Sequence, residues 1–310
     1  MQPFNTICHH LQDFTLEQIS FLQEIFEKNI SYTEHKKFKD HQRNQFKQQK
    51  LALQEGECLI VMDFKENLQL GGSAREIGQI FYSKTQISLL GSVIYFIDQG
   101  TLKKKHVNFL SKLLSHDGVF VKDCLRTLLS RYCSNLHSFK FWFDCGPHFR
   151  SKEVLHYLLV DYPNISFSST SSQKSLQVNY FAPSHGKSVC DSHFSTLSHW
   201  FRSYENSFPL TNFEQLIPLW LEANEVSNQQ KRNHKPLLDL NFEIYERTQR
   251  PFHVFKLKIS GVKQYFSWER SGNFLFRKMK TGVGHWDKVK VLSERIVEHR
   301  KDKFAPTFSN

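Results

Sequence analysis

Two aspartates in this sequence each follow a short hydrophobic run that is typical of a buried β-strand. Residues 58–62 precede Asp63, and residues 139–143 precede Asp144. Nearly continuous apolar runs of this length predict strands that are buried on both faces of a sheet. Open α/β sheets usually place their ligands at the carboxyl ends of strands. If the two strands are neighbours, their ends lie about 4.8 Å apart, so we expect both carboxylates to reach one metal ion.

A third carboxylate, Asp191, lies in the first turn of a predicted helix. The apolar stripe of this helix comprises Cys190, Phe194, Leu197 and Phe201. At about 100° per residue, Asp191 flanks the stripe and can face the other two aspartates while the stripe stays buried. A single aspartate after a strand is more often a turn former or a helix cap. Three aspartates in this order predict a shared site.

Three acidic side chains in a dry cleft point to divalent metal ions. Burial of like charges costs roughly several kcal/mol unless a cation balances them. Carboxylate oxygens suit Mg²⁺ or Mn²⁺. Two such ions about 4 Å apart would activate water or a 3′-hydroxyl for attack on a phosphodiester and would stabilise the leaving oxygen. The predicted chemistry is therefore that of a nuclease or of DNA strand transfer.

The hydrophobic pattern predicts the order of elements that must position these residues: three strands, a helix, a strand, a helix, a strand and a helix. These elements cover residues 58–62, 87–97, 106–114, 119–132, 139–143, 151–162, 176–181 and 188–204. A turn is expected at residues 98–100, between the second and third strands. An amphipathic helix capped by Thr15 and a polar, basic helix over residues 32–54 are predicted before the first strand.

We expect four segments along the chain. Residues 1–54 form an N-terminal helical segment, residues 55–206 an α/β catalytic domain, residues 207–234 a helical linker, and residues 235–310 a small, basic, β-rich module. The strands of this last module are expected at residues 252–259, 262–268 and 274–280. Its many lysines and arginines could bind DNA or mediate assembly.

Composition favours a globular protein with a polyanionic partner. Hydrophobic residues make up 39% of the chain and aromatic residues 14%, which is enough to build a packed core. There are 41 Lys and Arg against 30 Asp and Glu, a net charge of +11, and such an excess favours nucleic acid. The 6 cysteines form no C-x-x-C pair, which argues against a zinc ribbon or a disulfide scaffold and favours a reducing compartment. No apolar run is long enough for a membrane span, so no membrane association is expected.

Three segments of the chain resemble a known family. They are the D-F-x-E-N segment at residues 63–67, the strand that ends at Asp144, and the H-G-K-x-x-C-D segment at residues 185–191. Together they resemble the DDE/D transposase core of eukaryotic cut-and-paste elements and of their domesticated relatives. The resemblance covers residues 32–204, and the H-G-K-x-x-C-D segment is its most specific part. It implies a ribonuclease H-like fold, with a mixed five-stranded sheet flanked by helices.

The resemblance also implies roles for individual residues. Asp63, Asp144 and Asp191 would be the catalytic metal ligands and would bind two Mg²⁺ or Mn²⁺ ions. His185 and Lys187 would border the active site, where lysine suits a phosphate and histidine a water molecule or a leaving group. The remaining candidates at this border, or for contact with the DNA backbone, are His148, Arg150, Glu66 and Asn67.

The predicted function is that of a nuclear DNA transposase or transposase-derived recombinase that acts as a homo-oligomer on transposon ends and target DNA. The sequence departs from the family pattern, since Cys145 follows Asp144 and Ser-His-Phe follows Asp191. These departures leave two alternatives: a domesticated nuclear DNA-binding protein without catalytic activity, and a plain ribonuclease H-like nuclease. A zinc site is not predicted, because the cysteines and histidines lack finger-like spacing. A serine hydrolase is not predicted, because no G-x-S-x-G segment is present.

Overall fold

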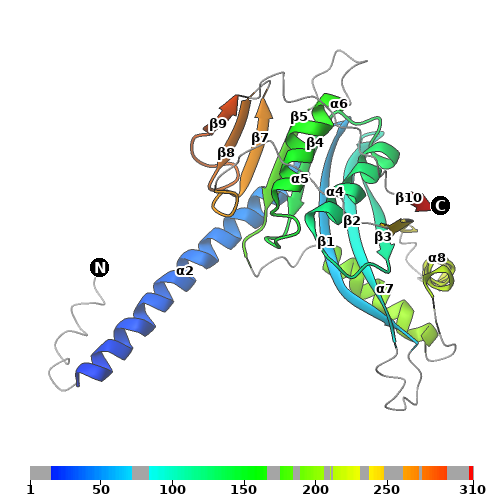
Figure 1. Cartoon of the computed structure of the whole chain (residues 1–310), viewed down its shortest axis with the longest axis horizontal. Helices are drawn as coiled ribbons and strands as arrows, with labels where there is room; N and C mark the ends of the chain where they lie inside the picture. Colours follow the sequence, from blue (N-terminus) through cyan, green and yellow to red (C-terminus); the bar gives the residue numbers. More distant parts are fainter. Residues whose placement is uncertain are drawn as a thin grey trace.

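The computed structural model contains a mixed β-sheet with helices on both faces (Figure 1). It describes residues 15–71, 84–165, 175–183, 189–205, 210, 212–230, 237–247, 261–271, 274–291 and 307–309. Over these residues the sheet has ten strands in the order β10-β6-β3-β2-β1-β4-β5-β7-β8-β9. The strands are β1 (Glu57–Leu70), β2 (Thr85–Asp98), β3 (Thr101–Ser111), β4 (Ser138–Phe143), β5 (Ser175–Tyr180), β6 (Asp239–Glu246), β7 (Ser267–Ser271), β8 (Phe274–Lys278), β9 (Asp287–Val291) and β10 (Thr307–Ser309).

Five strands form the centre of the sheet. Strands β1, β2 and β3 pair in antiparallel fashion, while β4 pairs parallel to β1 and β5 pairs parallel to β4. The predicted order of three strands followed by helix, strand, helix, strand and helix is confirmed. The sheet is wider than the five strands predicted, because β6 and β10 continue it beyond β3 and β7 to β9 continue it beyond β5. The strands of the predicted C-terminal module therefore belong to the same sheet as the central strands.

Helices cover both faces of the sheet and define two cores. The helical elements are α2 (Leu16–Leu51), α4 (Gly118–Thr127) with the π-helical turn η2 (Leu128–Tyr132), α5 (Lys152–His156), the π-helical turn η3 (Tyr157–Asp161), α6 (Tyr162–Ile165), α7 (Val189–Glu205) and α8 (Phe213–Gln230). On one face α4, α5 and η3 pack against Ile60 and Met62 of β1. On the other face α7, α8 and the end of α2 pack against Leu59 and Val61. Successive β1 residues thus point to opposite layers, as the pleat requires.

The predicted turn between β2 and β3 is present. Gln99 and Gly100 connect the two strands with φ angles of 50° and 71°, and Asp98 pairs with Thr101 across the hairpin. Two successive residues with positive φ are typical of a two-residue hairpin loop that matches the twist of the strands. The C-terminal expectations differ in detail, because residues 262–264 form a turn and β7 begins only at Ser267. Residues 252–259 lie outside the described residues.

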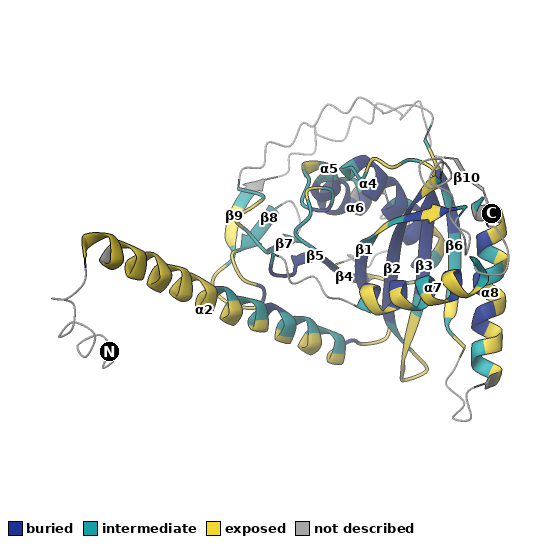
Figure 2. Ribbon diagram, turned by 90° about the horizontal axis from the view of Figure 1, so that it is seen from below, coloured by how far each residue is buried: buried dark blue, intermediate teal, exposed yellow. Residues whose placement is uncertain are grey.

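Helix α2 is one continuous helix where the sequence predicted two. The predicted cap is confirmed: the Thr15 hydroxyl accepts the N–H of Gln18, and the Gln18 side chain accepts the N–H of Thr15. The first half of the helix projects from the body and is exposed, while the second half lies along it (Figure 2). There Gln42 is fully buried, and its amide donates to the Tyr180 carbonyl at 2.7 Å. The basic helix is therefore docked on the sheet along its second half.

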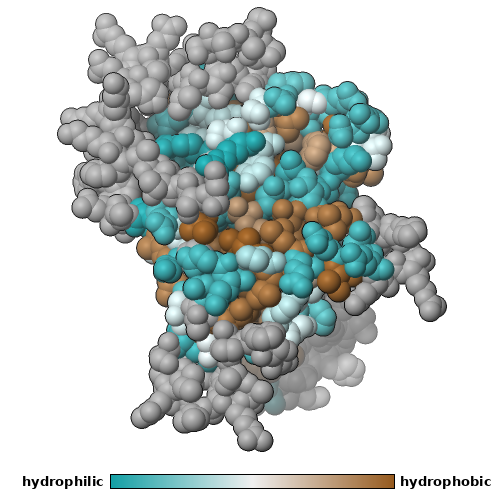
Figure 3. Space-filling model, turned by 90° about the vertical axis from the view of Figure 1, so that its right-hand side faces the viewer, coloured by the Kyte–Doolittle hydropathy of each residue, from teal (hydrophilic) through white to brown (hydrophobic). Residues whose placement is uncertain are grey.

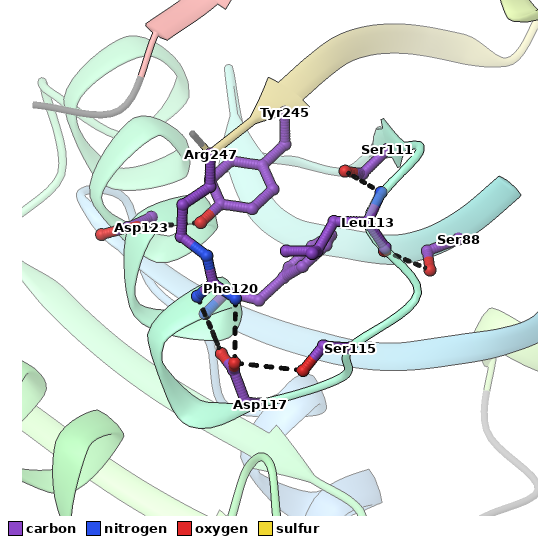
Figure 4. A network of polar contacts seen from close by, with 9 residues as sticks. All are labelled: Ser88, Ser111, Leu113, Ser115, Asp117, Phe120, Asp123, Tyr245 and Arg247. Atoms are coloured by element: carbon purple, nitrogen blue, oxygen red, sulfur yellow. Dashed lines mark hydrogen bonds and ion pairs between the residues drawn. The ribbon is translucent and has the colours of Figure 1, made fainter. Parts of the chain in front are cut away.

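Strand β6 was not predicted, and a group of ionic contacts fixes it against α4 and η2. We call this group the β6 network: the carboxylates Asp117, Asp123 and Glu243 with their partners. Arg247 donates to both oxygens of Asp117 at 3.1 and 3.0 Å, and Asp117 also caps α4 at the N–H of Phe120 (Figure 4). Three further contacts complete it. Tyr245 donates to Asp123 at 3.0 Å, and Arg131 and Tyr132 donate to Glu243 at 2.7 and 2.6 Å.

Hydrophobic side chains also gather on the outside of the molecule. Figure 3 shows a band of them on the side where α8 lies in Figure 1. On this helix Leu221 and Val226 are exposed, while Leu216 and Trp220 are buried against the sheet. Within the part of the chain that the structure describes, none of the helices has the length and apolar character needed to cross a membrane.

Candidate active site

Asp63 lies inside a strand and not at its end, which corrects the sequence prediction. Strand β1 continues to Leu70 because β2 pairs with it on both sides of an irregularity between Lys65 and Leu68. The pairing with β4, however, stops at Met62. Asp63 is therefore the first residue of β1 that lacks a β4 neighbour, and from there to Leu70 that edge of β1 carries no β4 pairing.

Asp144 lies beside Asp63, as predicted. Met62 pairs with Phe143 in parallel register, so the next residues on the two strands are Asp63 and Asp144. Adjacent strands lie about 4.8 Å apart. Val61 of β1 and Trp142 of β4 belong to the core under α7. Because side chains alternate along a strand, the two aspartates continue the same face, toward α7.

Helix α7 brings Asp191 to this face. Asp191 is exposed in the first turn of the helix, and its neighbour Cys190 is fully buried. The Cys190 thiol donates to the Val61 carbonyl at 3.6 Å. One turn later Phe194 packs on Gly91, the partner of Asp63 on β2, and a Cβ at Gly91 would overlap the Phe194 ring. The start of α7 is thus fixed directly over Asp63. We call Asp63, Asp144 and Asp191 the carboxylate cluster.

The charges of the carboxylate cluster act on one another. Burial raises the pKa of Asp63 to about 8, and the negative charges of Asp144 and Asp191 contribute to the rise. Burial also raises the pKa of Asp144, while a hydrogen bond from the Gly146 N–H at 3.0 Å lowers it. Both shifts favour the neutral form of these carboxyl groups in the absence of a cation.

The chemistry of these donors fits a hard divalent cation, since carboxylate oxygens are the ligands that Mg²⁺ and Mn²⁺ prefer. The side chains are close enough to repel one another but are not closed around a common point. Among the described residues, no three His, Cys, Asp or Glu side chains are grouped so as to hold a metal ion in this conformation. The backbone therefore brings the three carboxylates to one region, while their side chains do not surround a common point.

A group of aromatic rings borders Asp144 on the side of α4. His148 Nε2 lies 3.7 Å from Asp144 Oδ1, and the His148 ring meets Phe64 at 4.8 Å. Phe64 in turn stacks on His116 at 4.0 Å. Burial, with the charge of His116, lowers the pKa of His148 to about 4. His148 is therefore neutral at pH 7 and can donate a hydrogen bond without adding charge to the cluster.

Arg150 is engaged in contacts within the protein. Its guanidinium donates to the Tyr265 carbonyl at 2.9 Å and lies 4.1 Å from the centroid of the Phe266 ring. Cys145, the residue that departs from the family pattern, donates its thiol to the Phe181 carbonyl at 3.0 Å. Both residues join the loop after β4 to neighbouring backbone segments. These contacts give Arg150 a structural role in this conformation.

Of the other predicted residues, the structure describes Glu66 and Asn67. Glu66 is exposed and lines a cleft beside Asp191. Asn67 contacts Gln86 and Ser88 on β2, each at 3.5 Å. His185 and Lys187 lie outside the described residues, so their predicted roles remain predictions.

Two cations beside the cluster were missed by the sequence prediction. Lys65 and Arg202 line the same cleft as Asp191, which has a volume of about 490 Å³. Burial lowers the pKa of Lys65, and the charge of Arg202 acts in the same direction while that of Glu66 opposes it. The signal for Lys65 was its position two residues after Asp63, on the same face of a strand. That signal becomes visible only once β1 is known to continue past Asp63.

The residues of the carboxylate cluster lie in the segment that matches a known protein family. Residues 42–205 match the family described as a domain of unknown function, DUF8701, and the chain belongs to this family. The match begins in the docked half of α2 and ends with α7, so it includes all three carboxylates. A comparison with curated proteins found no match to the chain.

Proposed function

We propose that this protein is a DNA transposase, or a recombinase derived from one, with a ribonuclease H-like core and a DDD triad of Asp63, Asp144 and Asp191. The observation that carries the proposal is the arrangement of these carboxylates. Two directly follow the last residues by which β1 and β4 pair, and the third comes from the first turn of the helix over the same face. The charge of each acts on Asp63. Perturbed carboxylates that converge at the carboxyl end of a strand are typical of functional sites.

The architecture supports the ribonuclease H-like part of the proposal. The resemblance implies a mixed five-stranded sheet flanked by helices, and strands β1 to β5 at the centre of the sheet have this character. The H-G-K-x-x-C-D segment adds independent support, because its cysteine, Cys190, is the residue that anchors α7 beside Asp63. A buried thiol at this position places the following aspartate at the carboxylate cluster.

In the proposed mechanism the three aspartates would hold Mg²⁺ or Mn²⁺. The chemistry that bound ions supply is activation of water or a 3′-hydroxyl for in-line attack, with stabilisation of the leaving oxygen. The rigid pairing of β1 with β4 holds Asp63 and Asp144 at a fixed separation, and Cys190 fixes the start of α7. His148, whose Nε2 lies 3.7 Å from Asp144 Oδ1, would border this ligand.

The partners follow from the chemistry and the charge. A net charge of +11 favours a DNA polyanion. Joining of transposon ends to target DNA requires that two ends be held together, so we propose that the protein acts as a homo-oligomer in the nucleus. The second candidate function is that of a domesticated nuclear DNA-binding protein without turnover. The open ligand set among the described residues favours this candidate.

The proposal is tested by metal-dependent nicking and strand transfer on labelled duplex DNA. The three variants Asp63→Asn, Asp144→Asn and Asp191→Asn keep the shape of each side chain and remove its charge. Each should lower cleavage by about 10³-fold or more, because a metal ligand contributes several kcal/mol to stabilisation of the transition state. Asp98→Asn, an exposed carboxylate in the β2–β3 turn, is the matched control and should retain activity.

The two candidates give different results. Metal-dependent cleavage that survives all three substitutions would exclude this triad. DNA binding without cleavage by any form, in Mg²⁺ or Mn²⁺, would establish the non-catalytic candidate. Cleavage without joining of the 3′-ends would indicate a plain nuclease.

A further inference from the structure

A cleft runs beside the carboxylate cluster, along the edge of β1 that has no β4 neighbour. We call it the β1–α7 cleft. It has a volume of about 490 Å³ and lies between the second half of β1 and helix α7. Phe64 and Phe194 contribute its apolar surface, and Lys65, Arg202, Ser195 and Ser198 contribute polar groups. Asp191 of the carboxylate cluster lies in its wall.

Lys65 and Arg202 reach this cleft from two elements. Lys65 follows Asp63 by two residues on a strand, so its side chain points to the same face. Arg202 follows Asp191 by eleven residues on α7, which returns it to nearly the same side of a helix with 3.6 residues per turn. Both side chains line the β1–α7 cleft, so the two cationic groups face the same space.

Two cations held near each other are favourable where an anion lies between them. Glu66 lines the same cleft and offsets part of this charge, but its side chain is exposed. The Ser195 and Ser198 hydroxyls add groups that can donate to an oxyanion. Arginine and lysine with hydroxyl donors are the residues that proteins use for phosphate oxygens.

We propose that Lys65 and Arg202 bind a backbone phosphate of the DNA strand that is cleaved at the carboxylate cluster. The inference rests on the proposed function and names the part of the substrate that the cleft holds. Lys65 lies about 7 Å along the strand from Asp63. A DNA strand advances by about 3.4 Å per phosphate along its axis. The bound phosphate is therefore one or two nucleotides from the scissile position, and the cleft fixes the register of the strand.

The test is the salt dependence of DNA binding by the full chain. Binding of a fluorescein-labelled duplex is measured by anisotropy between 50 and 200 mM salt. Over this range a protein with roughly six to ten phosphate contacts loses most of its affinity for DNA. The variant Lys65→Met/Arg202→Gln removes both charges, and methionine keeps the apolar stem of the half-buried lysine. Lys103→Gln/Lys28→Gln removes two charges at exposed positions on β3 and α2 and is the matched control. Thermal unfolding verifies that each variant is folded.

The cleft variant should bind about 10-fold more weakly at 100 mM salt, and its plot of log K against log salt should be shallower by about 0.9, since the loss of one phosphate contact removes about that much from the slope. The slope of the control variant should change by less than half of that amount. Lys65→Arg alone should bind as the wild type does. An unchanged slope in the folded cleft variant would overturn the inference.

The outcomes also separate this inference from the proposed function. If the wild type binds with a cleft-dependent slope and does not cleave DNA, the phosphate site stands and the catalytic proposal fails. If the wild type cleaves and the cleft variant binds with an unchanged slope, the catalytic proposal stands and the phosphate site fails. Absence of DNA binding by the wild type overturns both.

Discussion

Two groups of three carboxylates, the β6 network and the carboxylate cluster, lie on opposite faces of the central sheet, and their surroundings differ. In the β6 network, under α4, each carboxylate has a matched partner: Arg247 for Asp117, Tyr245 for Asp123, and Arg131 with Tyr132 for Glu243. In the carboxylate cluster, under α7, the nearest charges that act on Asp63 are the other two carboxylates.

The pKa shifts of Asp117 and Asp63 have opposite signs, although burial raises the pKa of Asp123 in the β6 network as well. Burial alone would raise the pKa of Asp117, but hydrogen bonds from Arg247 and from the N–H of Phe120 outweigh it and hold the pKa below its usual value. The pKa of Asp63 is raised to about 8. Matched charges stabilise a fold, whereas unmatched charges are kept where a site needs them for a ligand. The ion pair at Asp117 therefore fits a structural role, and the raised pKa of Asp63 supports the functional site proposed above.

The largest expected effect is on stability, at the β6 network. Arg247→Met leaves the Asp117 carboxylate without its cation, although the side chain of Asp117 is only 14% exposed. Breaking one partner of such a pair costs about 3 kcal/mol, measured as the free energy of unfolding in urea. The double variant Asp117→Asn/Arg247→Met should lose less, because asparagine still caps α4 and no charge is left behind. Equal stability of Arg247→Met and the wild type would contradict a structural role for the pair.

The next effect is on the pH dependence of stability, at two histidines between these regions. His106 on β3 and His193 on α7 are 2% and 3% exposed, and their rings lie 4.2 Å apart. Burial lowers the pKa of His106 to about 3, with contributions from His193 and Lys104, and lowers that of His193 to about 4. Between these values and 6.5 the unfolded chain binds more protons, so stability falls as the pH falls through this window.

We expect a loss of about 2 kcal/mol between pH 7 and pH 4 from this pair. Urea unfolding at several pH values measures it. His106→Phe should reduce the loss, because it removes one titrating ring whose two nitrogens have no partner in the described part of the chain. The phenylalanine ring would keep the packing against His193. An identical pH profile for the variant and the wild type would show that the imidazoles do not cause the acid sensitivity.

The smallest expected effect has the opposite sign and comes from the carboxylate cluster. A raised pKa means that the folded protein holds a proton on Asp63 which the unfolded chain has lost. The contribution of Asp63 to stability therefore falls as the pH rises from about 4 to about 8. Asp63→Asn should stabilise the protein by about 1 kcal/mol at pH 8, after allowance for solvent screening, and by nothing at pH 4. A lower melting temperature at pH 8 would show that the Asp63 charge is already compensated.

Much of the site could be predicted from short-range patterns. The apolar runs before Asp63 and Asp144 predicted neighbouring strands, and the stripe that begins at Cys190 predicted the helix that carries Asp191. Strand β6 also had a signal, because Leu240, Phe242 and Ile244 alternate with polar residues. That signal was missed because the segment follows a polar, linker-like stretch.

The sequence by itself determined which residues form strands and helices, because hydrophobic periodicity and caps such as Thr15 are local properties. Only the tertiary structure decided where strands stop pairing. The extension of β1 past Asp63 depends on its long pairing with β2 and on the end of β4. The burial of polar Gln42 and the meeting of Lys65 with Arg202 depend on packing between distant segments. Such contacts join residues far apart along the chain, and no short window of sequence contains both partners.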